Sequence, residues 1–384
     1  MRVDSEADVQ RAIGRAVSNG YVARTFGTGH SFTPIVETDV LLDTGPLRGI
    51  IDVDPSHLTV KAKPKTTIGD FGDPLWDYGL ALANQGDIDT QAIAGAIATA
   101  THGSGLKQPN FSAALVGARI VDGSGNVVEV SRDVNADVLP ALQTSIGLLG
   151  IMTEVTLNVV HAYDLHARVD IMKYDDVMER FEADIDEYRH FGLFWMPTDA
   201  SAKLYNLHDA GADDCVVKRY REVEVGTPSD GLPDNERIDR SYRIYPMVYD
   251  PNFHEVEYFL PIEQAREIMD AMRRLMLDWL PLSVYPLEIR VVAGDDAWLS
   301  PNYQRDNLVV SISGEPGTDY WPYLRACDAL FAQFGGRPHW GKIHFMTPER
   351  IAGLFPRYQD FLEVRRRFDP NGTFLNSHLR QLFE

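Results

Sequence analysis

The sequence predicts an α+β protein made of two domains. Some segments carry apolar residues at helical spacing, and others alternate apolar with polar residues as half-buried strands do. Glycine and other small residues are concentrated before about residue 160, whereas aromatic and charged residues become more frequent after it. We therefore expect a ligand-binding domain over residues 1–160 and a second domain over residues 161–384.

Composition and charge exclude several classes of protein. The chain has 384 residues, 44% of them hydrophobic, and a formal net charge of −20. An acidic surface repels phosphates, which argues against nucleic acid and anionic membranes as partners. Cys215 and Cys327 fit no metal-ligand or redox spacing, so we expect free thiols in a reducing compartment. The sequence shows no signal pattern and no apolar run of membrane-spanning length, and we expect a cytoplasmic protein without membrane insertion.

The first elements lead into a glycine-rich turn. An apolar stripe at helical spacing ends before a glycine, and short apolar runs follow it. The elements expected here are a helix from Asp4 or Ser5 to Gly20, strands at 21–26, 40–43 and 58–62, a helix capped by Thr67, and a strand or turn at 79–84.

The residues Arg24-Thr-Phe-Gly-Thr-Gly-His-Ser-Phe-Thr33 carry a local signal for a ligand. Gly27 and Gly29 allow backbone conformations closed to other residues, and successive N–H groups in such a turn bind an anion such as a pyrophosphate. His30 follows directly, with a nucleophilic ring that can bond covalently to a flavin. The pattern is not a Rossmann fingerprint, because Phe32 stands where the third glycine belongs. An ordinary glycine turn with a polar histidine is the alternative.

A second run of small residues extends from Ile93 to Gly105. Its short side chains let the backbone pack against a flat ring system or against another helix, and both interpretations stay open. The glycines that follow His102 favour a ligand approached by the main chain. The elements expected next are a hairpin of strands at 116–121 and 127–130, a glycine-rich turn at 145–150 and an apolar strand at 151–160.

The second half predicts further strands and helices around a core. The methionine stripe of the helix after Pro261 is expected to be core packing. The elements expected are a long surface loop at 219–240, a strand at 256–260, a helix with Pro261 as its first residue, and a helix at 321–334 stopped by Gly335-Gly336.

Two segments of this half carry side chains suited to chemistry. Residues 283–292 predict a strand on which Glu288 and Arg290 share one face. They could form a simple surface ion pair, but the flanking apolar residues favour a sheet face that lines a cavity. Residues 337–345 form a second strand-like segment, whose Lys342 either grips a polyol, carries charge beside a flavin, or is a surface lysine. His339 and His344 do not match helical metal-ligand spacing, so we expect no metal site.

Six motifs, in this order, resemble those of a known family. They are Gly27-Thr-Gly-His-Ser-Phe, Thr101-His-Gly-Ser-Gly, Glu288-Ile-Arg290, Leu299-Ser-Pro, Phe334-Gly-Gly-Arg-Pro-His-Trp-Gly-Lys342 and Phe368-Asp-Pro-Asn-Gly-Thr-Phe-Leu-Asn376. Together they resemble the sugar-lactone oxidase and alditol oxidase group of the vanillyl-alcohol-oxidase flavoprotein superfamily, which includes gulonolactone, arabinonolactone and galactonolactone enzymes. The resemblance covers nearly the whole chain and is densest towards its carboxy terminus.

The resemblance implies an FAD-binding domain of two α+β subdomains, of the PCMH type, over residues 1–160. It implies a substrate domain over 161–384 with a large antiparallel sheet flanked by helices, whose C-terminal tail packs back on the FAD domain. FAD would be attached to His30 through its 8α methyl group. The other residues that the resemblance implies for FAD are Thr25, Phe26, Gly27, Thr28, Gly29, Ser31, Gly86, Asp87, Gly95, Thr99, Ala100, Thr101, His102, Gly150 and Met152.

The resemblance also implies the reaction, the oxidation of a CH–OH group of an aldono-1,4-lactone with hydride transfer to flavin N5. Glu288, Arg290 and Lys342 match the catalytic set that holds the sugar hydroxyls before the flavin. Arg290 and Lys342 are our candidates for stabilising the negative charge of the reduced flavin. The residues implied for substrate binding are Asp87, Glu288, Arg290, Ser311, Ser313 and Lys342.

Some positions depart from the family pattern. Asp87 stands where alditol oxidases carry serine, and Ser311 and Ser313 stand where they carry other polar residues. The segments at 285–296 and 334–342 are closer to the lactone oxidases, which we therefore favour. The family usually carries further residues before the first helix, so we expect either a shifted start or a trimmed domain.

Three alternatives to a lactone oxidase stay open. Gly86 leaves space for oxygen over the flavin, which favours molecular oxygen as the electron acceptor. The alternatives are an alditol oxidase of the xylitol or sorbitol type, a dehydrogenase of the same fold with another acceptor, and a flavin-binding protein without catalysis.

Overall fold

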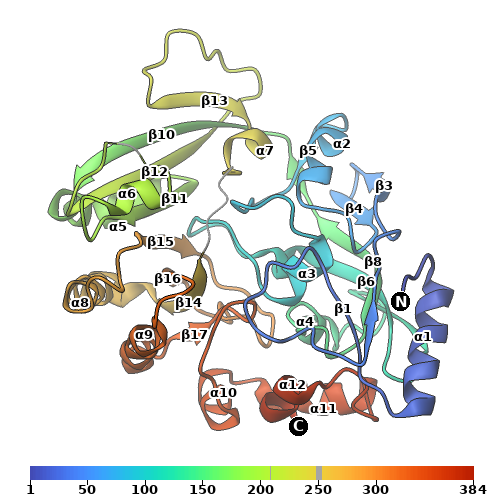
Figure 1. The fold of residues 1–384 in the computed structure, drawn as a ribbon. Helices are drawn as coiled ribbons and strands as arrows, with labels where there is room; N and C mark the ends of the chain where they lie inside the picture. The colour runs from blue at the N-terminus through green and yellow to red at the C-terminus, as the bar shows by residue number, and fades with distance from the viewer. Residues whose placement is uncertain (208, 248–252) are drawn as a thin grey trace.

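Two main β-sheets with helices packed against them make up the protein (Figure 1). The computed structural model describes residues 1–207, 209–247 and 253–384. The first 160 residues supply a five-stranded sheet, and the later residues supply an eight-stranded sheet. The predicted α+β class, with its large antiparallel sheet flanked by helices, is confirmed.

The smaller sheet has the strand order β3-β4-β8-β6-β7, and all neighbouring strands are antiparallel. The predicted hairpin is its β6–β7 edge. The strands of this half are β3 (Ile50–Asp54), β4 (Thr59–Ala62), β6 (Leu115–Val121), β7 (Val127–Ser131) and β8 (Ile151–Asn158), with two short pairs, β1 (Ala23–Thr25) with β2 (Val40–Leu42) and β5 (Leu80–Ala81) with β9 (Val160–His161).

The larger sheet has the order β13-β10-β12-β11-β15-β16-β14-β17 and is also antiparallel throughout. Successive side chains of a strand point to opposite faces, so one face joins the hydrophobic core and the other stays free for a site. The strands are β10 (Asp164–Lys173), β11 (His190–Trp195), β12 (Asp214–Val223), β13 (Glu236–Arg240), β14 (His254–Pro261), β15 (Leu287–Val292), β16 (Asn307–Gly314) and β17 (Arg337–Pro338).

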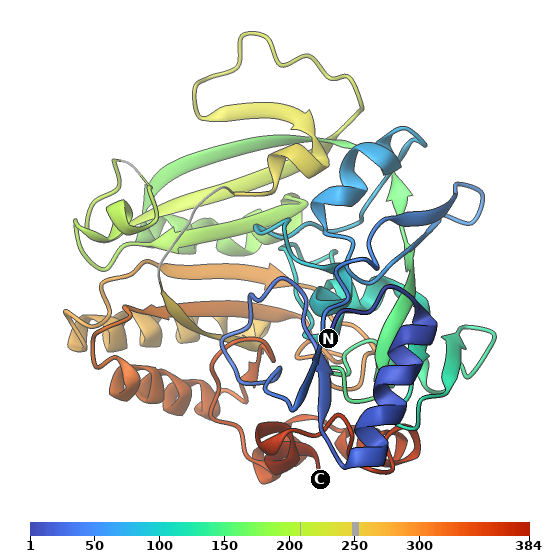
Figure 2. The ribbon, with the colours of Figure 1, turned by 45° about the vertical axis from the view of Figure 1, so that its right-hand side comes forward.

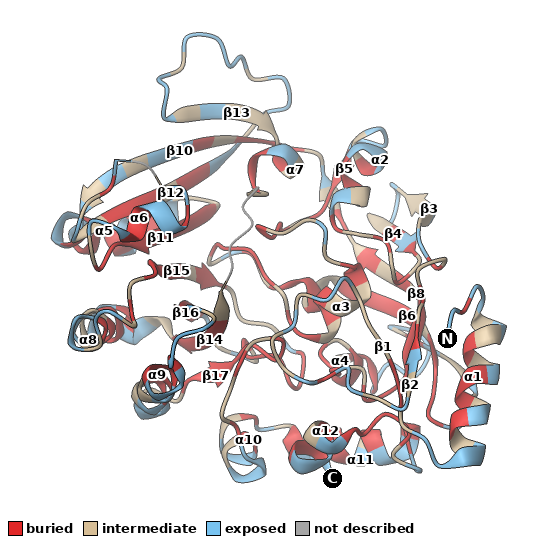
Figure 3. Cartoon of the chain, viewed as in Figure 1, coloured by how far each residue is buried: buried red, intermediate tan, exposed pale blue. Residues whose placement is uncertain are grey.

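Helices cover the apolar faces of the sheets, and buried residues fill the space between them (Figure 3). The predicted methionine stripe is core, because Met269 and Met272 on α8 are fully buried. The helices are α1 (Glu6–Asn19), α2 (Gly72–Trp76), α3 (Ile93–Ala98), α4 (Leu139–Leu142), α5 (Tyr174–Glu187), α6 (Ser201–Leu204), α7 (Ser241–Ile244), α8 (Ala265–Asp278), α9 (Trp321–Gln333), α10 (Pro348–Leu354), α11 (Tyr358–Phe368) and α12 (Ser377–Phe383), with 3-10 turns at Gly69–Phe71, Phe111–Ala114 and Ile262–Gln264.

Helix α1 forms for the reasons that the sequence predicts. The Ser5 side chain accepts a hydrogen bond from the Asp8 N–H at the amino end. Gly20 ends the helix in the left-handed conformation, with φ of 67°. A glycine adopts that conformation without the penalty a side chain would add.

Two predicted elements of the second half are wrong. The predicted surface loop at 219–240 contains the end of β12 and all of β13, so only residues 224–235 form a loop, which projects beyond the sheet (Figure 1). Glycines and prolines in this loop obscured the flanking strands, and the charged residues of β13 are typical of the edge strand that it is. In the segment 337–345, only β17 joins the sheet as a strand, and an isolated bridge pairs Ile343 with Val256.

Two predicted helix starts are also wrong. Thr67 does not cap a helix, because the element that follows it is a 3-10 turn at Gly69–Phe71 whose N-cap is Ile68, and the short α2 begins only at Gly72. Pro261 is the last residue of β14, and a 3-10 turn separates it from α8. Helical spacing of apolar residues does not distinguish these tight turns from a regular helix.

The C-terminal segment lies against the N-terminal strands, as Figure 2 shows from the turned view. The Ala23 N–H donates to the Thr373 carbonyl at 2.8 Å, and Asn376 Nδ2 donates to the Pro34 carbonyl at 2.8 Å. Gly123 N–H likewise donates to the Phe368 carbonyl at 2.8 Å. The C-terminal segment is therefore hydrogen-bonded to residues of the N-terminal half of the chain.

Arg24, on β1, links the C-terminal segment to the turn that precedes β8. It is buried, and its guanidinium donates to the carbonyl oxygens of Ile35 at 2.9 Å, Ile146 at 2.6 Å, and Gly147 and Phe374 at 3.1 Å. Burial lowers the pKa of Arg24 to about 10, with a smaller opposing effect of Asp369, so the group stays charged at neutral pH.

We predict that Arg24→Lys lowers the free energy of unfolding by about 3 kcal/mol, because one ammonium cannot reach all four carbonyls and leaves buried acceptors unpaired. Urea unfolding followed by circular dichroism measures the change. Arg15→Lys, on the exposed face of α1, is the matched control and should change it by less than about 0.5 kcal/mol. Equal effects of both variants would show that Arg24 has no special role in the fold.

Candidate active site

A cavity of about 310 Å³ lies between the two sheets. The glycine turn after β1, the segment around α3 and the turn before β8 form one side, and β14, β15 and the 339–342 segment form the other. The predicted site residues that line it are Thr25, Phe26, Gly27, Thr28, Gly29, His30, Ser31, Gly86, Asp87, Gly95, Thr99, Thr101, His102, Gly150, Met152, Glu288, Arg290 and Lys342.

The glycine turn has the properties of an anion site. Gly29 adopts a φ of 80°, which favours glycine. Within the described part of the chain, no N–H group of residues 27–31 donates a hydrogen bond. Lys65 Nζ supports the turn from behind by donating to the carbonyls of Phe26 at 3.0 Å and Gly27 at 2.6 Å. Free N–H groups in a glycine turn of this kind suit a pyrophosphate.

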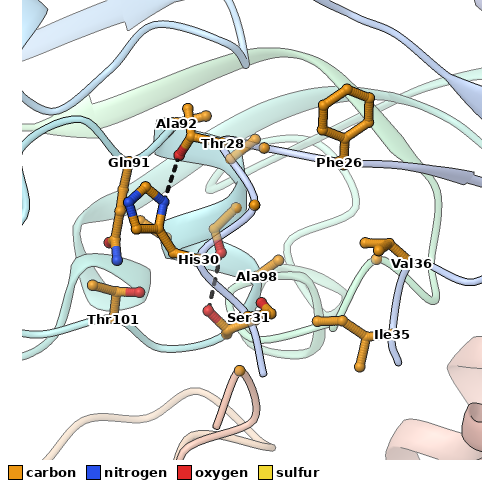
Figure 4. Close-up of a pocket in the computed structure, with 18 of the residues that line it drawn as sticks. Phe26, Thr28, His30, Ser31, Ile35, Val36, Gln91, Ala92, Ala98 and Thr101 are labelled. Atoms are coloured by element: carbon orange, nitrogen blue, oxygen red, sulfur yellow. Dashed lines mark hydrogen bonds between the residues drawn. The ribbon is translucent and has the colours of Figure 1, made fainter. Parts of the chain in front are cut away.

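His30 lies at the edge of this turn and faces the cavity (Figure 4). Its Nδ1 shares a hydrogen bond of 2.9 Å with Thr28 Oγ1. Partial burial lowers the pKa of His30, and the nearby charge of Lys342 lowers it further. The imidazole is therefore kept neutral, which is the nucleophilic form.

The segment that carries Lys342 holds the His30 loop in place. Phe32 N–H donates to the Gly341 carbonyl at 2.7 Å, and Thr33 Oγ1 donates to the Trp340 carbonyl at 3.3 Å. Lys342 Nζ also lies 5.1 Å from the centre of the Phe32 ring. Residues that are far apart in sequence are thus fixed relative to each other at the cavity.

Small residues around α3 allow close packing of the chain and also line the cavity. A Cβ on Gly27 would lie 3.4 Å from Ala92 Cβ, and one on Gly103 would lie 1.8 Å from the Gln85 carbonyl oxygen. Close packing of the chain against itself therefore requires glycine at 103. Gly95 and Thr99, in the same run, line the cavity.

One face of the larger sheet presents acids to the cavity. Glu255 and Glu257 alternate on β14 and Glu288 lies on β15, and all three are buried. Asp87 adds a fourth carboxylate from the opposite side. Buried carboxylates need partners, and each of these four has one.

The partners of these carboxylates are basic side chains. Arg290 Nε donates to Glu288 Oε1 at 2.8 Å, and Arg290 Nη2 also contacts Asp87. Lys342 Nζ contacts Glu255. Burial lowers the pKa of Lys342, but the charges of Glu255 and Glu257 outweigh it and raise the pKa overall. Lys342 is therefore an ammonium.

His102 and Glu257 form a buried pair, 3.0 Å apart between Nε2 and Oε1. Nδ1 of His102 lies 2.8 Å from the Gly103 carbonyl, which can only accept, so Nδ1 carries a proton. Burial raises the pKa of Glu257, but the charge and hydrogen bond of His102 outweigh it and lower the pKa overall. His102 is therefore the buried hydrogen-bond partner of the Glu257 carboxylate.

Sequence reasoning missed several residues of the site. Glu255 and Glu257 could have been found by applying to β14 the two-residue alternation used for β15. No sequence signal marks Lys65. Ala100, Ser311 and Ser313 are not among the described residues that line the cavity, and the Ser311 hydroxyl instead donates to Glu255.

These donor groups fit FAD. The free N–H groups of the glycine turn suit its pyrophosphate. Among the residues that the structure describes, no cluster of three or more His, Cys, Asp or Glu side chains could hold a metal ion. Across the same described ranges, no helix is both long and apolar enough to cross a membrane.

Two family models match the chain. An FAD binding domain matches residues 1–131, and D-arabinono-1,4-lactone oxidase matches residues 215–382. L-gulono-1,4-lactone dehydrogenase from Mycobacterium tuberculosis is 31% identical over 413 residues, which cover 100% of this chain and 95% of that protein.

Two oxidases are also similar. L-gulonolactone oxidase from Mus musculus is 26% identical and covers 99% of this chain and 93% of its own length. Alditol oxidase from a Streptomyces species is 26% identical and covers 93% of this chain and 89% of its own length. The solved structure of cholesterol oxidase from B. sterolicum matches with a TM-score of 0.85 over 100% of this chain and 93% of its own, at 16% identity, which shows a shared fold.

Fold, cavity and similarity together define an FAD-dependent oxidoreductase. The chain belongs to the sugar-lactone oxidase and dehydrogenase family of the vanillyl-alcohol-oxidase flavoproteins, to which the alditol oxidases are related.

Buried neutral histidines should make stability depend on pH. Burial lowers the pKa of His190 to about 3, and the charge of Arg189 adds to the effect. The unfolded chain takes up a proton at this histidine near pH 6.5, whereas the folded chain does not until about pH 3. The stability from His190 is thus complete above about pH 6.5 and is lost as the pH falls towards 3.

We predict that His190→Phe reduces the slope of the free energy of unfolding against pH, by about 1.4 kcal/mol per pH unit between pH 6 and pH 4. Urea unfolding at a series of pH values measures the slope. The difference between wild type and variant at pH 8 is the reference, because His190 is neutral in both the folded and the unfolded chain there, so that difference contains no proton uptake. Parallel curves from pH 8 to 4 would contradict the prediction.

Proposed function

We propose that the protein oxidises a CH–OH group of an aldono-1,4-lactone, with bound FAD as the hydride acceptor and molecular oxygen as the final acceptor. The convergence of Glu288, Arg290 and Lys342 on the cavity beside the His30 loop carries this proposal. The relatives named lactone oxidases and dehydrogenases, and the lactone oxidase model over residues 215–382, support the substrate class.

Three polar residues of the cavity bind and orient the substrate in this reaction. Glu288 accepts a hydrogen bond from a substrate hydroxyl and so orients the carbon that is oxidised. Arg290 and Lys342 donate to substrate oxygens, and their positive charges stabilise the negative charge that FAD gains as it takes up the hydride. Ser311 does not contact the substrate in this proposal. Its hydroxyl donates to Glu255, and Glu255 in turn accepts from Lys342, so Ser311 helps to position Lys342.

We also propose a covalent bond between FAD and His30. Support comes from the neutral ring, its position in the cavity and the contacts that fix its loop. The two functional domains would be residues 1–160 and 161–384. The C-terminal contacts with β1 support the packing of the tail on the first domain.

The proposal also names the electron acceptor and the cellular compartment. Gly86 lines the cavity and leaves space for oxygen, which favours an oxidase. The similar proteins include a dehydrogenase as well as oxidases, so a non-oxygen acceptor is the second candidate. The buried free thiols Cys215 and Cys327 favour the reducing cytoplasm as its location.

An alditol oxidase is the second candidate for the substrate class, because of the similarity to the Streptomyces enzyme. Anaerobic bleaching of the flavin absorbance by a panel of aldonolactones and alditols, followed by admission of air, separates these functions. We expect bleaching by a lactone and rapid recovery of colour in air. Bleaching by alditols alone would make the protein an alditol oxidase. Slow recovery of colour in air would favour an electron acceptor other than oxygen. If no member of the panel bleached the flavin, the proposal would be overturned.

We predict that His30→Ala releases its flavin on acid precipitation, whereas the wild-type protein retains it. The reason is that FAD in the variant is held only by non-covalent contacts, which unfolding removes. Fluorescence of the washed precipitate measures the retained flavin. His57→Ala, at an exposed position outside the cavity, is the control and should retain flavin like the wild type. Retention by the His30 variant would show that another residue forms the bond.

A further inference from the structure

Arg290 is held between two carboxylates from distant parts of the chain. Its Nη2 contacts Asp87 from the segment before α3 and also contacts Glu288, and its Nε donates to Glu288 Oε1 at 2.8 Å. Asp87 is 7% exposed and Glu288 is 8% exposed. Two buried carboxylates therefore share one guanidinium.

One positive charge cannot fully neutralise two negative charges, so the two carboxyls differ in how they hold a proton. Burial raises the pKa of Asp87, but the charge of Arg290, helped by Lys218, outweighs it and lowers the pKa overall. Burial raises the pKa of Glu288, and the charge of Asp87 adds to the increase, so that Arg290 does not cancel it. Environments that separate two carboxyls in this way are typical of acid–base pairs in enzymes.

Other ionisable groups also face Glu288. Lys218 on β12 favours its charged form, and Glu255 on β14 opposes it. Gly192, opposite Arg290 on β11, has no side chain, and a Cβ there would lie 3.7 Å from Arg290 Cγ. The further groups that interact electrostatically with Glu288 or Arg290 are Glu257, His339, Lys342, Tyr205, Tyr220 and Tyr245.

We propose that Asp87 is a positioning residue that occupies Arg290 as its permanent counter-ion, so that Glu288 is the group that takes the proton from the substrate hydroxyl. This inference rests on the proposed function and names the proton acceptor that the proposed function leaves open. A serine at position 87 would carry no charge, and Arg290 would then pair with Glu288 alone.

The reaction breaks one C–H bond and one O–H bond of the substrate. The C–H bond of the alcohol carbon breaks, and its electron pair leaves with the hydrogen as hydride to the bound FAD. The O–H bond breaks, its proton bonds to the Glu288 carboxylate, and its electron pair forms the new C=O bond. The substrate loses two electrons and two hydrogens, and Glu288 returns its proton to water when the ketone product leaves.

The charge of Asp87 strengthens Glu288 as a base. A base accepts a proton more readily as its pKa approaches the working pH, provided that it is still ionised. Arg290 alone would make Glu288 a weaker base. Asp87 offsets that effect and leaves the guanidinium in place to bind a substrate oxygen.

The test compares Asp87→Asn with wild type by the anaerobic bleaching rate at saturating lactone, measured as a function of pH. The rate should rise with pH as Glu288 loses its proton. Removing the charge of Asp87 lowers the pKa of Glu288, so the rise should move to lower pH by about one unit. The plateau rate should fall at the same time, because the base is weaker.

Asp184→Asn is the matched control. Asp184 is fully buried and pairs with Arg219, which a second carboxylate, Asp170, also contacts at 2.9 Å. The substitution therefore removes a charge from an equivalent cluster that does not line the cavity. We expect lower stability in this variant and an unchanged pH dependence of bleaching.

Infrared difference spectra recorded against pH provide a readout that does not depend on turnover. The resting holoenzyme should show the carbonyl band of a protonated carboxyl group that titrates at higher pH in wild type than in Asp87→Asn. Glu288→Gln should lack this band and should bleach about 100-fold more slowly at the plateau.

The outcomes separate this inference from the proposed function. A shift of the pH dependence and of the infrared band in Asp87→Asn supports the inference. A uniform loss of rate without either shift overturns it, while bleaching by a lactone leaves the proposed function standing. If no lactone or alditol bleaches the wild-type flavin, the proposed function fails, and an unshifted infrared band would then overturn the coupling of Asp87 to Glu288 as well.

Discussion

The burial of charge between the two sheets is the constraint on which the site depends. Among the described residues, four carboxylates line the cavity, and an ion in such a place is tolerated only when a partner neutralises it. Those partners come from β15, from the 339–342 segment and from His102 after α3. Pairing these charges therefore requires the first 160 residues and the later residues to be held in one arrangement.

Hydrogen bonds to backbone carbonyls also hold that arrangement. Arg24 joins the strand before the glycine turn to the turn before β8 and to the C-terminal segment. The contacts of Phe32 and Thr33 fix the His30 loop to the segment that ends at Lys342. The positions of the imidazole and the ammonium are thus fixed by hydrogen bonds to main-chain carbonyls, which a change in one cavity carboxylate does not remove.

The sequence predicts those parts of the site that repeat with a simple period or contain glycine. Glu288 and Arg290 share a face as the alternation of β15 requires, and Gly29 adopts the left-handed conformation expected of the turn. The strand β13 was not predicted, because the sequence of an edge strand with many charged side chains resembles that of a loop. Lys65 was not predicted either. Its role depends on a hydrogen bond to the Gly27 carbonyl, 38 positions away in the sequence, and no local pattern encodes such a contact.

The fold alone does not decide the substrate. Cholesterol oxidase has the same fold at 16% identity, although a sterol and a sugar lactone differ in nearly every polar contact they offer. The difference has to lie in the side chains on the free face of the larger sheet and in the loop opposite. In this chain that face presents Glu255, Glu257 and Glu288, and the loop presents Asp87. Such a surface suits a ligand with several hydroxyl groups, since each carboxylate can accept from a hydroxyl while its basic partner donates to an oxygen. The sheet therefore supplies the geometry common to the fold, and the arrangement of charges on it supplies the chemistry.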